Sequence, residues 1–261
     1  MHDLLDDYAQ SNALRDINPR LKLFLGLCTI LLCVSSTSPL APLLVALTMG
    51  LITVTLAQIP GRFYGRLLLI PISFALISSV AIAFMHGTGQ TLFSLGAFGY
   101  TISMREDGAN LALLLISRTL GATGALFFIA LTTPTIEIFA TLKSLKVPES
   151  VIELSMMIYR YIFVFLDQAA MIHSAQMMRL GNAGLWNSLR SFAMLSCVLF
   201  LRSWEQGERL IVAMDARSYS GRLEIMVPPE AGAKPKAVLA VIAYLAAVAA
   251  ISAITRDMLL L

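Results

Sequence analysis

Five long runs of apolar residues dominate this chain of 261 residues. About 20 apolar residues are needed to cross the roughly 30 Å hydrocarbon core of a bilayer. Over the whole chain 57% of the residues are hydrophobic and only 13% are charged, whereas an average soluble domain has roughly 25% charged residues. The sequence therefore predicts an integral membrane protein, with spans at residues 21–37, 40–59, 67–84, 109–131 and 237–254.

Lys and Arg are unevenly shared between the segments that connect these spans. Because cytoplasmic loops retain Lys and Arg, the distribution predicts the orientation. With the N-terminus inside, the outer segments hold only Arg105 and Arg256. The long inner segment holds eleven Lys and Arg residues, and the short inner segments hold Arg15, Arg20, Lys22, Arg62 and Arg66. We therefore predict a multi-pass protein of the inner (cell) membrane with its N-terminus in the cytoplasm and its C-terminus outside.

The N-terminal residues carry Asp3, Asp6 and Asp7 rather than a basic region. This pattern differs from that of a secretory signal peptide, so we expect the first span to remain in the mature protein.

The segment 132–236 differs from the rest of the chain, because charged residues alternate there with apolar stretches too short to span a membrane. Pro134 precedes a short helical pattern that ends near Lys146, and Pro148 stands at a favourable first helical position. We therefore divide the chain into four membrane helices over 1–131, a cytoplasmic domain over 132–236 and a last membrane helix over 237–261.

Two long helices are predicted within this cytoplasmic domain. One runs from Glu149 to Leu180 and ends at Gly181 and Gly184, and a second runs from residue 185 to about 218. In the first helix, Arg160 and Asp167 enclose only six apolar residues, so a membrane span would bury both charges at a cost of several kcal/mol. The predicted fold class is an all-α membrane protein with about five spans and a pair of long amphipathic helices at the cytoplasmic face.

Motifs for catalysis and nucleotide binding are missing from the sequence. It contains no G-x-x-x-x-G-K-[ST], so the chain cannot be its own P-loop ATPase, and it contains no H-E-x-x-H or G-x-S-x-G. The net charge of +3 gives no reason to expect nucleic acid as a partner. We predict no catalytic residue, no metal ligand and no cofactor.

Arg118 is the one charged residue near the middle of a predicted span, and it lies near Gly121 and Gly124. An intramembrane Arg normally faces a bundle interior or a partner, and small residues permit close helix approach. The sequence leaves both a contact within the bundle and a contact with another subunit open.

Two other classes of function remain as alternatives. A membrane-embedded enzyme could use Asp3, Asp6 and Asp7, or Arg118, against a diphosphate lipid, but a second acidic cluster is missing from the sequence. A self-sufficient permease would be expected to carry ionisable residues in several spans, and only Arg118 qualifies.

Several motifs, taken together, resemble the transmembrane coupling component (T component) of energy-coupling factor transporters, and most of all its cobalt-transport branch, CbiQ. The resemblance covers essentially the whole chain. The motifs are Asn18-Pro19-Arg20-Leu21-Lys22, Leu131-Thr132-Thr133-Pro134, Leu145-Lys146-Val147-Pro148-Glu149, Tyr159-Arg160-Tyr161, Ala175-Gln176-Met177-Met178-Arg179-Leu180-Gly181 and Ala213-Met214-Asp215-Ala216-Arg217-Ser218-Tyr219.

The resemblance implies two Ala-Arg-Gly signatures at the ends of two crossed cytoplasmic helices, each inserting into a groove of one ATPase subunit. The first is Met178-Arg179-Leu180 followed by Gly181, and the second is Ala216-Arg217-Ser218. Both keep the arginine, and both depart from the consensus at flanking positions. A guanidinium suits this role because it is always charged and offers a rigid fork of donors.

The resemblance also implies the function and the partners. The chain would be a non-catalytic subunit of an ATP-driven importer and would transmit the motions of two cytoplasmic ATPase subunits to a separate substrate-binding membrane subunit. Cobalt is the expected substrate, with nickel or a vitamin as alternatives that the sequence leaves open.

Overall fold

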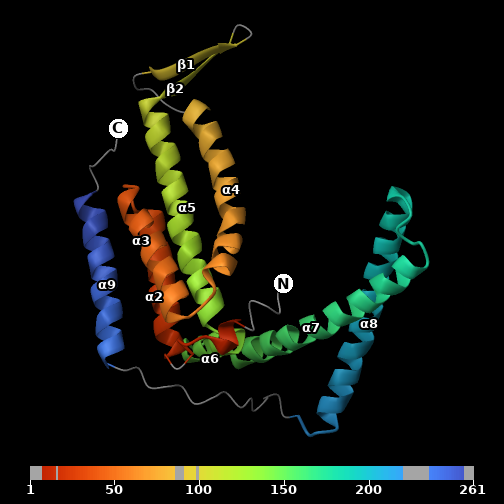
Figure 1. Ribbon diagram of the computed structural model, residues 1–261. Coiled ribbons are helices and arrows are strands. Elements are labelled where there is room, and N and C mark those ends of the chain that lie inside the picture. Colours follow the sequence, from red (N-terminus) through yellow and green to blue (C-terminus); the bar gives the residue numbers. More distant parts are fainter. Residues whose placement is uncertain (1–7, 16, 86–90, 98–99, 220–234, 256–261) are drawn as a thin grey trace. The chain divides into compact units, whose positions relative to one another are not determined.

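The computed structural model describes residues 8–15, 17–85, 91–97, 100–219 and 235–255 (Figure 1). The chain forms two compact units, which we call the bundle unit and the hairpin unit. The bundle unit comprises Met1–Ile138 and Pro228–Leu261, and the hairpin unit comprises Phe139–Val227.

Apolar helices make up most of the bundle unit. The first, α2, begins where the Asn18 side chain accepts a hydrogen bond from the Arg20 N–H and where proline stands at the first helical position. The helices are α2 (Pro19–Ser35), α3 (Leu40–Leu51), which continues as the π-helix η1 (Ile52–Leu56), α4 (Gly61–Met85), α5 (Glu106–Thr132) and α9 (Pro235–Ile254).

Three of these helices are long and apolar enough to cross a membrane. They contain the segments Gly61–Phe84, Asp107–Thr132 and Pro235–Ile254. The other two predicted spans form α2, which has 17 residues, and the shorter apolar helix Leu40–Leu56. The prediction of an all-α membrane protein is therefore confirmed, while the number of five spans stays a prediction.

Helix α5 is at the centre of the bundle unit, where it packs against α2, α3 and α4. A Cβ atom at Gly121 would lie 2.6 Å from the Pro42 carbonyl oxygen and 2.8 Å from Cys33 Sγ, so this glycine allows three helices to meet. The buried core contains Leu25 and Cys33 of α2, Val45 and Met49 of α3, Ala125, Phe128 and Ile129 of α5, and Val248 of α9.

The structure differs from the sequence prediction between α4 and α5. The sequence predicts a Gly-rich outer loop here within an all-α protein, but this segment holds strand β1 (Thr91–Ala97), paired antiparallel with strand β2 (Tyr100–Arg105). Aromatic and β-branched residues such as Phe93 and Ile102 favour extended backbone, which gives a physical reason for the two strands.

The hairpin unit is built from α7 (Glu149–Met178) and α8 (Leu185–Asp215), which cross in Figure 1. A short helix, α6 (Thr135–Ser144), precedes them and begins directly after Pro134. Helix α8 runs without interruption through Gly207, where its Glu205 and Arg209 side chains approach to 3.6 Å. Both long helices appear where the sequence predicts them, ending two to three residues earlier.

Candidate coupling site

Helix α7 ends in a tight turn with Arg179 at the C-cap. The Gly181 N–H donates to the Gln176 carbonyl over 2.9 Å, and the Leu180 N–H donates to the Met177 carbonyl over 3.0 Å. These two bonds define a Schellman motif, which requires a left-handed residue after the C-cap. Leu180 takes that conformation, with φ of 57°.

The second arginine signature has the same turn. The Tyr219 N–H donates to the Met214 carbonyl over 3.1 Å, and the Ser218 N–H donates to the Asp215 carbonyl over 3.0 Å. Ser218 has φ of 57°, like Leu180. In both turns the arginine immediately precedes the left-handed residue. The turn therefore gives a physical reason for the glycine in the Ala-Arg-Gly signature that the resemblance implies, because glycine adopts this conformation without a Cβ clash.

The backbone turns satisfy the Gln176 and Met177 carbonyls at the end of α7 and the Met214 and Asp215 carbonyls at the end of α8, so these carbonyls need no arginine cap. Arg179 and Arg217 are exposed, and within the described residues neither side chain has a hydrogen-bond or ion-pair partner. Helix α6 ends in a similar turn at Lys146, with φ of 62°, but its preceding residue is Leu145. An exposed arginine beside the left-handed residue thus distinguishes the α7 and α8 ends from the α6 end.

The two arginines lie at opposite ends of the hairpin. Residues 181–184 join α7 to α8, so Arg179 stands beside the start of α8 and Arg217 follows its end. At about 1.5 Å per residue, the 31 residues of α8 place the two turns roughly 46 Å apart.

Side-chain hydrogen bonds hold the Arg179 end of the hairpin together. Gln176 Nε2 donates to the Ser191 carbonyl, and Ser191 Oγ donates to the Gly181 carbonyl, both over 2.9 Å. A Cβ atom at Gly181 would come within 2.8 Å of Ser191 Oγ and 2.9 Å of the Gln176 carbonyl oxygen. The structure therefore gives Gly181 a packing role, since it lets the end of α7 lie against α8.

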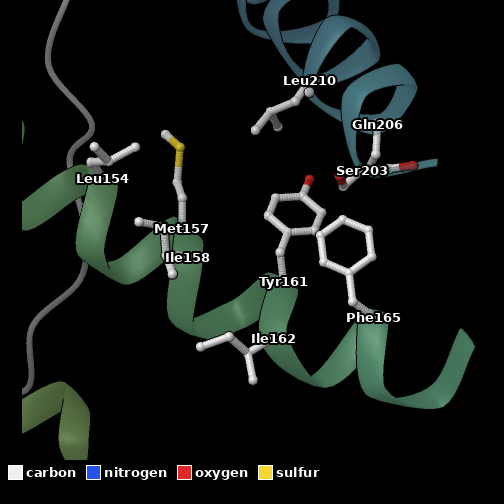
Figure 2. Close-up of a pocket in the computed structure, with 10 residues that line it drawn as sticks. Leu154, Met157, Ile158, Tyr161, Ile162, Phe165, Ser203, Gln206 and Leu210 are labelled. Carbon is white, nitrogen blue, oxygen red and sulfur yellow. The ribbon is translucent and has the colours of Figure 1, made fainter. Parts of the chain in front are cut away.

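Between the two ends, α7 and α8 enclose an open apolar cavity of about 280 Å³ (Figure 2). Aromatic and aliphatic side chains of α7 face two polar residues, one glycine and one leucine of α8 across it. The lining residues are Leu154, Met157, Ile158, Tyr161, Ile162, Phe165, Ser203, Gln206, Gly207 and Leu210.

At the Arg217 end, a polar contact links the two helices. Tyr219 Oη donates to Glu153 Oε2 over 3.1 Å, and Glu153 is buried with 8% exposure. Desolvation raises the pKa of the Tyr219 hydroxyl, and the hydrogen bond to Glu153 and the negative charge of that carboxylate raise it further. This pair has no local sequence signal, because Glu153 and Tyr219 are 66 residues apart in the chain.

Arg118 makes a contact inside the bundle unit. Its Nε donates to the Ser36 carbonyl over 2.9 Å, and its Nη2 also donates to that oxygen. Ser36 is the C-cap of α2, so the guanidinium neutralises the negative end of that helix. Gly121 allows α5 to meet α2 and α3, and a Cβ atom at Gly124 would lie 3.4 Å from the Tyr64 hydroxyl. A subunit contact at these three residues stays a prediction.

Helix α2 provides the reciprocal cap for α5. Lys22 Nζ donates to the Thr132 carbonyl over 3.0 Å, and Thr132 is the last residue of α5. Lys22 is only 3% exposed. Asn12 Nδ2 also approaches the Leu131 and Thr132 carbonyls at 3.4 Å. The sequence predicts Lys22 only as a cytoplasmic charge, because its partner is 110 residues away in the chain.

Two further expectations concern metals and acidic clusters. Within the part of the chain that the structure describes, no three His, Cys, Asp or Glu side chains gather as a metal site. Asp3, Asp6 and Asp7, on which the enzyme alternative rests, lie outside the described residues.

Comparison with known proteins gives the family. The profile of the CbiQ family, described as cobalt transport protein, matches residues 10–227. The chain belongs to the CbiQ family. This membership confirms the resemblance drawn from the two arginine signatures and the motifs around them, and it places the chain among components of membrane transport systems.

Three relatives illustrate the breadth of the CbiQ family match. A putative fused cobalt transport protein CbiMQ of Methanocorpusculum labreanum is 42% identical over 91% of this chain, which spans only 40% of that relative. The cobalt transport protein CbiQ of Rhodobacter capsulatus is 28% identical, covering 78% of this chain and 80% of the relative. The energy-coupling factor transporter transmembrane protein EcfT of Limosilactobacillus fermentum is 26% identical, covering 80% of both chains.

The cap on α2 predicts the effect of Arg118→Leu in this CbiQ protein. The substitution leaves the buried Ser36 carbonyl without its cationic donor, so we expect the isolated subunit in detergent to lose about 1–3 kcal/mol of stability. Thermal unfolding of the purified subunit measures this, with Arg62→Leu at an exposed position as the control. Unchanged stability of the isolated subunit, combined with loss of a partner subunit, would mean that Arg118 acts as a subunit contact instead.

The left-handed turn predicts a stabilising effect of Leu180→Gly. A Cβ atom in this conformation costs about 1–2 kcal/mol, so glycine should slow hydrogen exchange of the Gly181 amide by roughly tenfold. The control is Ala175→Gly, also exposed but inside α7, which should destabilise the helix end by about 1 kcal/mol. Faster exchange in the Leu180→Gly variant would show that the turn does not carry this strain.

Proposed function

We propose that this protein is the transmembrane coupling subunit of an energy-coupling factor importer. Two partner ATPase subunits bind and hydrolyse ATP on the cytoplasmic side, and each holds one of the arginine turns. Met178, Arg179, Leu180 and Gly181 form one contact, and Ala216, Arg217 and Ser218 form the other.

The observation that carries this proposal is the repetition of one turn at two sites. Both signatures have the same pattern of backbone hydrogen bonds, and both leave an exposed guanidinium at a helix end. A separation of roughly 46 Å along α8 allows each turn to contact a different subunit. An Arg fork suits pairing with carboxylates and carbonyls on such a partner.

The hairpin unit would transmit motion, because a long continuous helix carries a displacement at one end to the other. Closing and opening of the ATPase pair would move α7 and α8, and these helices would shift a separate substrate-binding membrane subunit. In this proposal residues 132–236 form the cytoplasmic coupling domain, residues 1–131 and 237–261 lie in the inner membrane, the N-terminus is cytoplasmic and the C-terminus is outside.

Cobalt is the substrate that we propose, since the matching family and two of the three relatives are described as cobalt transport proteins. The substrate would be selected by the partner membrane subunit. Nickel or a vitamin would use the same coupling mechanism, and uptake assays with each substrate distinguish them.

Charge reversal at the two arginines tests the proposal. We expect Arg179→Glu and Arg217→Glu each to lower uptake, and the double variant to lose the co-purifying ATPase, because repulsion replaces an arginine contact worth about 2 kcal/mol or more at each turn. Pull-down from solubilised membranes, with ATPase activity measured on the eluate, gives the readout.

Arg202→Glu provides the matched control, because Arg202 is an exposed arginine of α8 away from both turns. It should retain the ATPase, and all variants should insert into the membrane in normal amounts. Retention of the ATPase by the double variant would contradict the proposal.

A further inference from the structure

The two arginine turns share a backbone but differ in the side chains beside the arginine. At the α7 end these are Met178 and Leu180, and at the α8 end they are Ala216 and Ser218. Because the hydrogen bonds and the left-handed φ are the same in both turns, the side chains alone distinguish how the two ends meet a partner.

Apolar exposure is concentrated at the α7 end. Met178, Leu185 and Trp186 are 88%, 87% and 86% exposed, which makes them the most exposed large apolar side chains among the described residues. They exceed the outward-facing residues of the membrane helix α4, where Phe74 reaches 74%. Leu180 follows closely with 77%. We call these four residues, together with Arg179, the apolar tip.

The apolar tip is held rigid and carries positive charge. The Gln176–Ser191 and Ser191–Gly181 hydrogen bonds fix it against α8. No Asp or Glu occurs between Asp167 and Glu205, so no acidic side chain in this stretch of sequence offsets the charge of Arg179. An apolar surface flanked by the guanidinium groups of Arg179 and Arg190 is complementary to an apolar pocket with an acidic rim. Trp and Arg are also the residues that most often dominate binding at protein interfaces.

A protein partner fits this arrangement better than a lipid surface does. A helix that binds the membrane interface presents an apolar face along its length, with several cations on the opposite face. Here the most exposed apolar side chains gather at a turn between two helices, on both sides of Arg179, and Arg190 lies one helical turn after Trp186.

We propose that the apolar tip is the dominant anchor for an ATPase subunit and that the Arg217 end is the weaker contact. Trp186, Met178 and Leu180 would enter an apolar pocket of that subunit, and Arg179 would pair with carboxylates at its rim. The inference rests on the proposed coupling function and adds to it that the two docking ends are unequal.

Exchanging the flanking residues between the two turns tests this inequality. The tip variant carries Met178→Ala and Leu180→Ser, and the reciprocal variant carries Ala216→Met and Ser218→Leu, so that each turn receives the side chains of the other. Neither variant introduces glycine at the left-handed positions 180 and 218, so the backbone strain of the two turns is unchanged. Affinity of the purified ATPase for each full-length variant in detergent is the readout, with thermal unfolding as the check on folding.

The two tryptophans supply a matched pair for a second comparison. Trp186 and Trp204 both lie on α8, are 86% and 64% exposed, and are 18 residues apart, which is five helical turns. Trp204 differs in that its Nε1 donates a hydrogen bond to Glu208 Oε1 of the same helix over 2.9 Å. Trp186→Ala should therefore weaken ATPase binding by roughly tenfold or more, whereas Trp204→Ala should leave it unchanged.

The expected results are a loss of about tenfold or more in the tip variant and a gain in the reciprocal variant. Equal affinity of wild type, tip variant and Trp186→Ala would overturn the inference, while the double arginine variant would still test the coupling function separately.

An effect of Trp186→Ala that appears only in nanodiscs with anionic lipid, and not in detergent, would assign the tip to the membrane. An effect on self-association of the subunit alone would assign it to a second copy of this chain. Either result would overturn the inference.

Discussion

The carbonyl groups at helix C-termini are the constraint on which the rest of this structure depends. An unpaired carbonyl is costly in a low-dielectric interior, and the chain satisfies its helix ends in two different ways. In the bundle unit, cationic side chains do so, with Arg118 on the end of α2 and Lys22 on the end of α5. In the hairpin unit the backbone caps itself, and Arg179 and Arg217 remain exposed at the same kind of helix end.

Arg118 therefore has a structural role in the bundle unit, whereas Arg179 and Arg217 belong to the candidate coupling site. The antiparallel helices α2 and α5 cap each other, and Gly121 lets them approach closely, so the centre of the bundle unit resists deformation. The hairpin unit joins α7 and α8 by hydrogen bonds at both ends and leaves an apolar cavity between them. In the proposed function this unit would move as a lever, with the two arginine turns at its ends.

The sequence alone predicted much of the fold and the candidate site, because both depend on local patterns. Apolar length located the membrane helices, and Gly181 and Gly184 located the hairpin turn. The missed features depend on residues distant in sequence or on backbone conformation. Lys22 donates a hydrogen bond to Thr132, which is 110 residues away in the chain, and Tyr219 donates one to Glu153, which is 66 residues away. Leu180 and Ser218 adopt a left-handed conformation, and the sequence does not predict this because neither residue is glycine.

Photo-crosslinking can determine whether each arginine turn contacts its own ATPase subunit, as we propose. A photoreactive amino acid would replace Met178 or Ala216, singly and together, in the assembled transporter in its membrane. We expect each position to crosslink to the corresponding groove of an ATPase subunit, and the doubly substituted chain to carry two ATPase subunits. Crosslinking of both positions to one and the same ATPase subunit, or to lipid and the membrane partner alone, would contradict the account.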